Sequence, residues 1–309
     1  MIVVCGEALI DVIHNRDGTR HSAPGGGPFN TARALARLGV PVAFLGRLST
    51  DPSGKLLTDR LAADGVDLRL ASFGPEPTTR AIATVLADGT TTYEFLHEGT
   101  SAPSLAADML PVQLGHEVDA IHFGSLGLVF EPMASSLAAL VQRDRAGRLV
   151  MVDPNMRSGL IDDGDYRDRL QAGIAASSIV KASEADIAFL MPGTSIENAA
   201  AAMVGNGASL AVVTLGERGA FAAHRDLRVH VPAPQVEVVD TIGAGDAFGA
   251  GLLAWLHDNG KASPDLSLDD KALRAALAYA CLVAAVTCTR RGADPPWKRE
   301  LDLARDQAR

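Results

Sequence analysis

DTIGAGDAFGAG, residues 240–251, is the stretch that says most about this protein. The apolar run before it, Val236 to Val239, is typical of the end of a strand. The residues after it, from Ala247 to His257, are apolar or small and predict a buried helix. A helix N-terminus presents free backbone N–H groups and the positive end of the helix dipole. The glycine-rich turn therefore predicts a binding site for an oxyanion.

An aspartate, Asp246, lies in the same turn. A carboxylate would repel a resting phosphate, so phosphate anchoring does not explain it. It is explained if a hydroxyl group lies between the carboxylate and the anion, because Asp246 then accepts the hydroxyl proton as a phosphoryl group arrives. A simpler interpretation stays open here: aspartate is a favoured helix N-cap, and glycines allow tight turns.

Composition narrows the class of protein. With 309 residues, 47% hydrophobic and 21% charged, the chain is long enough to bury a large core. The net charge of −9 argues against a general nucleic-acid or anionic-membrane surface. Cys281 and Cys288 are seven apart in one apolar run, which favours buried free thiols over a disulfide. We see neither a leader segment nor an apolar run of membrane-spanning length, and we expect a cytoplasmic protein.

A second glycine-rich turn, GGGPFN at residues 25–30, lies near the start of the chain. Its glycines have no side chains, so the backbone can approach a ligand closely. The alanine-rich helix that follows is expected to end at Gly39. Asn30 could bind a ligand or simply cap that helix. Asp11 lies at the end of a strand-like segment, where a solvated carboxylate is also a sufficient explanation.

The order of elements indicates the fold class. From Ala120 onward, strand-like and helix-like segments alternate, which predicts a parallel sheet with helices on both faces. Ligands of such α/β proteins bind at the carboxyl ends of the strands. Two β-rich runs, Thr78 to Leu86 and Thr90 to Phe95, are joined by Ala-Asp-Gly and predict a hairpin.

The two glycine-rich turns resemble, in this order, the two signatures of the ribokinase-like (phosphofructokinase-B type) sugar kinases. The resemblance extends from Asp11 to about Pro296. It implies an α/β fold, a three-layer αβα sandwich with a mostly parallel central sheet and a small β-sheet lid. It further implies a single domain over residues 1–309, with the lid inserted from about 12–22 and 78–97. ATP and Mg²⁺ are the implied cofactors.

The resemblance also assigns roles, with Asp246 as the catalytic base. The implied anion hole is formed by the backbone of Gly243, Ala244 and Gly245. The residues implied to bind the sugar are Asp11, Gly26, Gly27, Asn30, Arg157 and Asp246. Arg80 and Phe95 would lie near the sugar if the lid forms as in relatives.

Arg157 ends the segment Asp-Pro-Asn-Met-Arg at residues 153–157. Pro154 and Asn155 suit a turn, which explains everything in the segment except the arginine. A similar segment lies at the active site in the fructokinase and ketodeoxygluconate-kinase branches of the family. The resemblance therefore implies that Arg157 is catalytic, a cationic clamp on the transferring phosphate.

The expected nucleotide site is built from several segments. Residues 214–219, TLGERG, resemble the family's nucleotide-phosphate turn. Residues 183–186 stand where relatives have Asn-x-x-Glu, which organises water and magnesium, but here read Ser-Glu-Ala-Asp, which also suits a helix cap. The residues implied to bind the nucleotide are Thr214, Gly216, Gly219, Gly243, Gly245, Ser183, Asp186 and Cys281.

A monovalent cation, potassium in particular, is implied beside the anion hole. Its ligands would be Asp240 and the carbonyl of Ile242, enclosed by residues 289–296. The eight histidines show no metal-ligand spacing, and we assign no metal to them.

The substrate implied by the quoted segments is D-fructose, phosphorylated to fructose 6-phosphate. The alternative within the family is 2-keto-3-deoxygluconate, although those kinases more often have an acidic residue where Pro28 stands. An alternative of another class is a catalytically silent sugar-sensing protein. A dinucleotide-dependent oxidoreductase is excluded because the Gly-x-Gly lies near the end of the chain and no acidic residue follows at ribose-binding distance. The expected partners are a small sugar and ATP, with a homodimer as the expected assembly.

Overall fold

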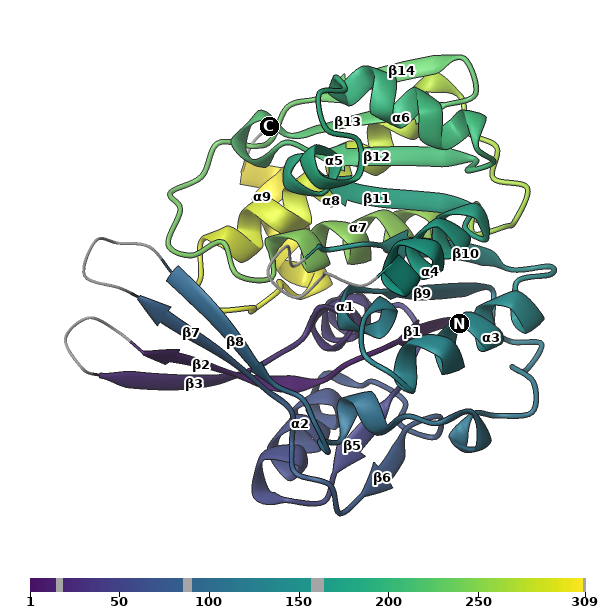
Figure 1. Cartoon of the computed structure of the whole chain (residues 1–309). Helices are drawn as coiled ribbons and strands as arrows, with labels where there is room; N and C mark the ends of the chain where they lie inside the picture. Colours follow the sequence, from purple (N-terminus) through teal and green to yellow (C-terminus); the bar gives the residue numbers. More distant parts are fainter. Residues whose placement is uncertain (15–18, 86–90, 157–163, 308–309) are drawn as a thin grey trace.

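The computed structural model describes residues 1–14, 19–85, 91–156 and 164–307. An eight-stranded sheet forms its centre, in the order β14-β13-β12-β11-β10-β9-β1-β4, in which only β13 runs antiparallel to its neighbours β12 and β14 (Figure 1). Its strands are β1 (Ile2–Cys5), β4 (Val42–Leu45), β9 (Ala120–Gly124), β10 (Leu149–Asp153), β11 (Ile179–Ser183), β12 (Leu210–Thr214), β13 (Ala220–His224) and β14 (Leu227–Val231).

Helices cover both faces of this sheet because its strands are apolar on both sides. Val3 and Val4 of β1, for example, are both fully buried, and they belong to two different core clusters. The first cluster is covered by α1 (Gly27–Arg37), α2 (Pro52–Asp64), α7 (Ala244–Asp258) and α8 (Asp270–Cys288). The second is covered by α3 (Met133–Asp144), α4 (Gly164–Ala175), α5 (Glu184–Leu190) and α6 (Ile196–Gly205). This confirms the predicted three-layer αβα sandwich.

A smaller sheet extends from the carboxyl edge of the large one, because β2 begins four residues after the end of β1 (Figure 1). Its order is β3-β2-β7-β8. Its strands are β2 (Leu9–His14), β3 (Arg20–Gly25), β7 (Arg80–Val85) and β8 (Thr91–Leu96). The predicted hairpin is confirmed by the antiparallel pairing of β7 with β8. Its turn falls in residues 86–90, outside the described part of the chain, and the single-domain assignment stays a prediction.

The remaining elements are short or peripheral. They are β5 (Arg47–Ser49), β6 (Ser72–Gly74), α9 (Lys298–Gln307) and the 3₁₀ turns Ala102–Ser104, Ala107–Met109, Ser125–Leu128 and Gly216–Arg218.

Two local expectations were wrong. The run from Val236 to Val239 is an exposed extended loop and not a strand, because it passes over the end of α8, where the N–H of Val239 donates to the Cys288 carbonyl (2.8 Å). The expectation that no apolar segment reaches membrane-spanning length also fails, since the 19-residue helix α8 satisfies that test. Half of that segment is buried, and α8 packs closely on α7, where a Cβ at Gly251 would lie 3.0 Å from Ala280 Cα.

Candidate active site

The anion-hole turn leads directly into α7. Gly243 is the N-cap, with φ +77°, and a Cβ there would lie 2.6 Å from the Cβ of Ala293. Only glycine suits this backbone angle and this close approach. Asp246 therefore lies inside the first turn, and the interpretation of Asp246 as the helix cap is wrong.

An anion hole requires backbone N–H groups without an acceptor of their own. Among the described residues, the N–H groups of Gly243 and Gly245 have no acceptor, which leaves them available to a ligand. The N–H of Ala244 donates to the Thr241 carbonyl (3.2 Å) and is therefore already engaged.

The two glycine-rich turns meet at one hydrogen bond. Asn30 Nδ2 donates to Asp246 Oδ2 (2.9 Å), although 216 positions separate the two residues. Asn30 is not the cap of α1, because that place belongs to Gly26, with φ +106°. The N–H of Asn30 instead bonds the Gly26 carbonyl, which leaves its side chain free to reach α7.

A narrow pocket opens at this junction. Its lining residues are Gly27, Pro28, His122, Gly124, Ser125, Asp153, Asn155 and Asp246. A Cβ at Gly27 would lie 3.3 Å from both Asn155 Nδ2 and Asp246 Oδ1, so glycine keeps this space open. Ser125 and Asn155 have positive φ angles, 53° and 43°, which are uncommon for these residue types and recur at functional sites.

Sequence analysis missed Ser125 entirely and interpreted Asn155 only as a turn residue. The signal for Asn155 was its place after Asp-Pro at the end of a core strand. Arg157, expected at the same place, lies outside the described residues.

Buried charged side chains surround the pocket, and sequence analysis missed them too. Burial raises the pKa of Glu7 to about 7, against hydrogen bonds that lower it, one of them from the Gly27 N–H (3.2 Å). Lys181 forms a buried ion pair with Asp153, in which Nζ and Oδ2 are 2.5 Å apart. Burial and this nearby ammonium lower the pKa of His122 to about 3, so that its imidazole is neutral. Glu7, Lys181 and His122 follow apolar strand residues in the sequence and belong to no sequence motif.

The predicted sugar ligand Asp11 lies in the middle of β2, paired with Ala23 and Ala81 in the small sheet. Successive strand residues point to opposite faces of a sheet. Ile10, Val12 and Arg80 line a larger cavity of about 460 Å³ on the other face. Arg80, which pairs with Ile10, therefore does not share the face of Asp11. In the part of the chain that the structure describes, the cavity has no lining residue in common with the Asp246 pocket.

The predicted nucleotide turn follows β12. Thr214 ends the strand, and Gly216 and Gly219 both have positive φ angles, 59° and 90°. A Cβ at Gly219 would lie 2.0 Å from the Val231 carbonyl oxygen, so the turn requires glycine there. An ion pair between Arg218 and Glu184 ties the turn to α5.

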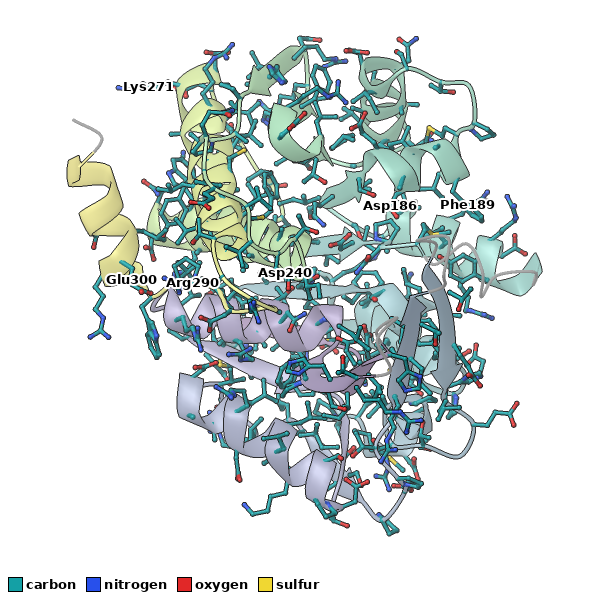
Figure 2. All side chains as sticks on the ribbon, turned by 90° about the vertical axis from the view of Figure 1, so that its left-hand side faces the viewer. Asp186, Phe189, Asp240, Lys271, Arg290 and Glu300 are labelled. Carbon is teal, nitrogen blue, oxygen red and sulfur yellow. The ribbon has the colours of Figure 1, made fainter. Side chains whose placement is uncertain are left out.

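Ser183 and Asp186 form a capping box on α5. The Asp186 side chain, almost fully buried, accepts hydrogen bonds from Ser183 and from the Met156 N–H (2.6 Å). Figure 2 shows Asp186 and Asp240 on the carboxyl edge of the sheet, facing the viewer. The helix-cap interpretation accounts for the contacts between Ser183 and Asp186 but not for the Met156 N–H, and a role in binding the nucleotide stays a prediction.

The proposed cation ligands lie in the loop before α7. Asp240 accepts hydrogen bonds from the N–H groups of Ile242 (3.1 Å) and Gly292 (2.8 Å), which joins that loop to the segment after α8. Among the described residues, no three His, Cys, Asp or Glu side chains cluster as metal ligands would. Cys281 is buried on α8, and burial raises its pKa to about 11, so it is a neutral thiol.

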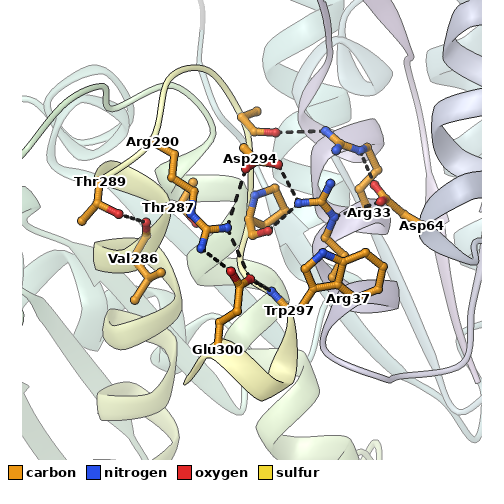
Figure 3. Close-up of polar contacts among 12 residues, drawn as sticks. Arg33, Arg37, Asp64, Val286, Thr287, Thr289, Arg290, Asp294, Trp297 and Glu300 are labelled. Carbon is orange, nitrogen blue, oxygen red and sulfur yellow. Dashed lines mark hydrogen bonds and ion pairs between the residues drawn. The ribbon is translucent and has the colours of Figure 1, made fainter. Parts of the chain in front are cut away.

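An arginine network ties α1 to the segment after α8 (Figure 3). Asp64, at the end of α2, accepts from Arg33 (2.6 Å) and Arg37 (2.9 Å) of α1. Arg33 also donates to the Ala293 carbonyl (2.9 Å), and Arg37 pairs with Asp294 (2.6 Å). The helix that carries Asn30 is thereby attached to the segment that packs on Gly243.

Comparison with known proteins gives the family. The model of the pfkB family of carbohydrate kinases matches residues 1–299. The chain belongs to this family. Its sequence is 40% identical over 282 residues to a fructokinase of Rhizobium leguminosarum bv. trifolii, covering 89% of this chain and 86% of that protein.

Solved pfkB-type structures agree with this assignment. A fructokinase of Xylella fastidiosa with bound ATP has a TM-score of 0.89 and 27% identity, covering 100% of this chain and 99% of that one. A fructokinase double mutant of Vibrio cholerae with fructose, ADP and potassium has a TM-score of 0.81 and 28% identity, covering 94% and 93%. The predicted ribokinase-like fold and the carbohydrate-kinase activity of this pfkB-family chain are thus confirmed.

Proposed function

We propose that this pfkB-family kinase transfers the γ-phosphoryl group of ATP to D-fructose and forms fructose 6-phosphate. The observation that supports the proposal is the hydrogen bond from Asn30 to Asp246, which joins the proposed sugar ligand to the proposed base. The similarity to fructokinases supports the sugar, and the relative with bound ATP supports the donor.

In this reaction Asp246 accepts the proton of the attacking hydroxyl. The hydroxyl oxygen then bonds to the γ-phosphorus, the bond from that phosphorus to the β–γ bridging oxygen breaks, and ADP leaves with the electron pair. Backbone N–H groups of Gly243 and Gly245 donate to the charge that develops on the transferring group. Asp11, Gly26, Gly27 and Asn30 hold the sugar, with Arg157 as the proposed clamp.

Two ions belong to the proposal. Magnesium typically retains waters and binds substrate phosphates with few protein ligands, which fits a site without a preformed carboxylate cluster among the described residues. When bound, it would neutralise charge on the nucleotide phosphates. Potassium would be held by Asp240 and the Ile242 carbonyl, and the similar structure containing potassium supports this assignment.

Pro28 favours a neutral sugar over ketodeoxygluconate. This proline is buried, lines the pocket and packs on Gly6, where a Cβ would lie 2.5 Å from Pro28 Cγ. It lacks the acidic side chain that ketodeoxygluconate kinases more often have at this position, which supports fructose as the substrate.

The deciding experiment is ADP release with Mg²⁺–ATP against fructose, 2-keto-3-deoxygluconate, ribose, glucose and adenosine, each with and without potassium. The proposal requires the highest kcat/KM with fructose. Preference for ketodeoxygluconate would retain the mechanism and reject the substrate. Sugar binding by calorimetry without turnover of any sugar would instead support the silent sensor.

The cytoplasmic location and the homodimer remain predictions. Measuring the native mass by light scattering tests whether the protein is a homodimer.

A further inference from the structure

Lys181 is a buried cation that the proposed mechanism does not use. It lies on β11, only 4% exposed, beside Asp153 on the neighbouring strand β10. Met151 pairs with Ile179 in the sheet, so Asp153 and Lys181, each two residues further on, share a face with them. That face is the one covered by α7, since Met151 and Ile179 belong to the same core cluster as Phe248.

The Lys181 side chain extends from β11 toward the first turn of α7. A Cβ at Gly245 would lie 3.3 Å from Lys181 Nζ, and a Cβ at Gly249 would lie 3.8 Å from Lys181 Cδ. These two glycines are one helical turn apart on α7. Gly245 leaves space for the lysine Nζ, whereas a Cβ at Gly249 would be in ordinary contact with the lysine stem.

Backbone geometry does not explain those glycines. Neither Gly245 nor Gly249 has a positive φ angle, and both lie within α7, where glycine costs about 1 kcal/mol relative to alanine. The close approach of Lys181 Nζ explains Gly245, whereas the nearest neighbour of a Cβ at Gly249 would be Met151 Cε, at 3.3 Å.

Lys181 interacts with the charges of the site. Burial alone would lower its pKa, but Asp153 together with Asp246 and Asp186 raises it above the ordinary value, so the side chain is a stable ammonium. Isolated burial of such a charge would be costly, and Asp153 supplies the counterion.

We propose that Lys181 is a positioning residue for phosphoryl transfer. Its ammonium, held by Asp153 beneath Gly245, keeps the Asp246 carboxylate ionised and adds positive charge behind the anion hole. This inference rests on the proposed function, because it gives Asp246 the role of base.

The test compares wild type with Lys181→Met, which keeps the shape of the side chain and removes its charge. We expect kcat to fall on the order of 10²-fold, as for loss of other preorganised electrostatic partners, with KM for the sugar nearly unchanged. Because Lys181→Met leaves Asp153 buried without its counterion, the double variant Lys181→Met/Asp153→Asn is measured beside it. Its unfolding midpoint should recover toward wild type, while its kcat stays low.

The pH profile of kcat/KM distinguishes this role from a structural one. The amount of folded enzyme changes the height of the profile, but not the pH at which activity declines. The acidic limb of kcat/KM should move up by on the order of one pH unit in Lys181→Met, since an opposite charge has been removed from near the base. Within the described part of the chain, the other charged or titratable groups that share this site with Asp246 are Asp153 from β10, His122 from β9 and Glu7 from the loop after β1, and Asn30 from α1 donates to it. Glu7 itself titrates, so the comparison is repeated with Glu7→Gln in both proteins.

A double variant with wild-type kcat, or an unshifted acidic limb in the Glu7→Gln background, would overturn the inference. Failure of the proposed function would appear separately, as a wild-type enzyme that prefers another sugar. The Lys181 comparison is then made with that sugar.

Discussion

Asp246 receives a hydrogen bond from Asn30 at the start of another helix, and the Lys181 ammonium lies beneath the residue before it. Such a carboxylate is oriented before substrate arrives, which reduces the reorganisation needed in the transition state.

Asp246→Asn should fold normally and lose nearly all turnover. The amide oxygen can still accept the hydrogen bond from Asn30, but an amide cannot take the proton of the sugar hydroxyl, so kcat should fall on the order of 10²–10⁴-fold. Steady-state kinetics measures the loss, and circular dichroism checks the fold. Near-normal turnover in a folded variant would contradict the role of base.

Glu7 should make the stability of the protein depend on pH. Its folded pKa of about 7 exceeds the ordinary value of 4.5 because burial disfavours the charged form. The folded state therefore holds the proton more tightly, and wild type should lose up to about 3 kcal/mol of unfolding free energy as pH rises from about 4.5 to 7.

Glu7→Gln should lack this loss. Denaturant titrations of both proteins at pH 5 and pH 8 measure the difference. Identical pH dependence in wild type and Glu7→Gln would show that Glu7 does not titrate in this window.

At the scale of elements, α2 carries two acidic residues in opposite environments. Asp64→Asn should destabilise the protein by roughly 3 kcal/mol, because its 5% exposed carboxylate serves two buried arginines: among the described residues, Arg33 would lose its counterion, and Arg37 would keep only Asp294. Asp59→Asn is the matched control: its partner Lys55 is 72% exposed, so its loss should cost less than about 1 kcal/mol. Chemical denaturation measures both, and equal costs would mean that the arginine network adds nothing to stability.

The nucleotide turn offers a second matched pair, Gly219→Ala and Gly216→Ala. Both residues have positive φ angles, but only Gly219 faces a backbone oxygen, while nothing lies within 4 Å of a Cβ at Gly216. Gly219→Ala should cost more than about 2 kcal/mol and raise KM for ATP, whereas strain alone should cost Gly216→Ala about 1 kcal/mol. Thermal unfolding measures the two losses of stability, and ATP titrations measure the two KM values. A larger loss for Gly216→Ala than for Gly219→Ala would contradict the geometry.

At the scale of the whole molecule, the proposed sugar site joins the small sheet to the large one. A ligand that binds only the folded state stabilises it by about 2.7 kcal/mol at a concentration of 100 Kd. Fructose should therefore raise the unfolding midpoint of wild type, and Asp11→Asn should reduce that rise because Asp11 lies on β2. An equal rise in both proteins would remove Asp11 from the sugar site.

The family, the fold class and the two turns of the site could be predicted from the sequence. These features are local: glycines that permit a close backbone approach, and apolar runs whose alternation predicts a sheet covered on both faces. The same local signals failed for Val236 to Val239, whose apolar residues lie on the surface. Whether such a run becomes a strand depends on a neighbouring strand with free hydrogen-bonding groups, which composition does not reveal.

Which side chains meet could be seen only in the folded protein. Asn30 contacts Asp246, and Lys181 lies under Gly245, because the order of strands in the sheet brings the ends of β1, β10 and β11 beneath the N-termini of α1 and α7. Glu7 and Lys181 belong to no sequence motif. A charged residue is recognised as buried from the residues around it in the folded protein, and not from those next to it in the sequence. The physical reason is that desolvation and ion pairing depend on distance in space, which the fold sets.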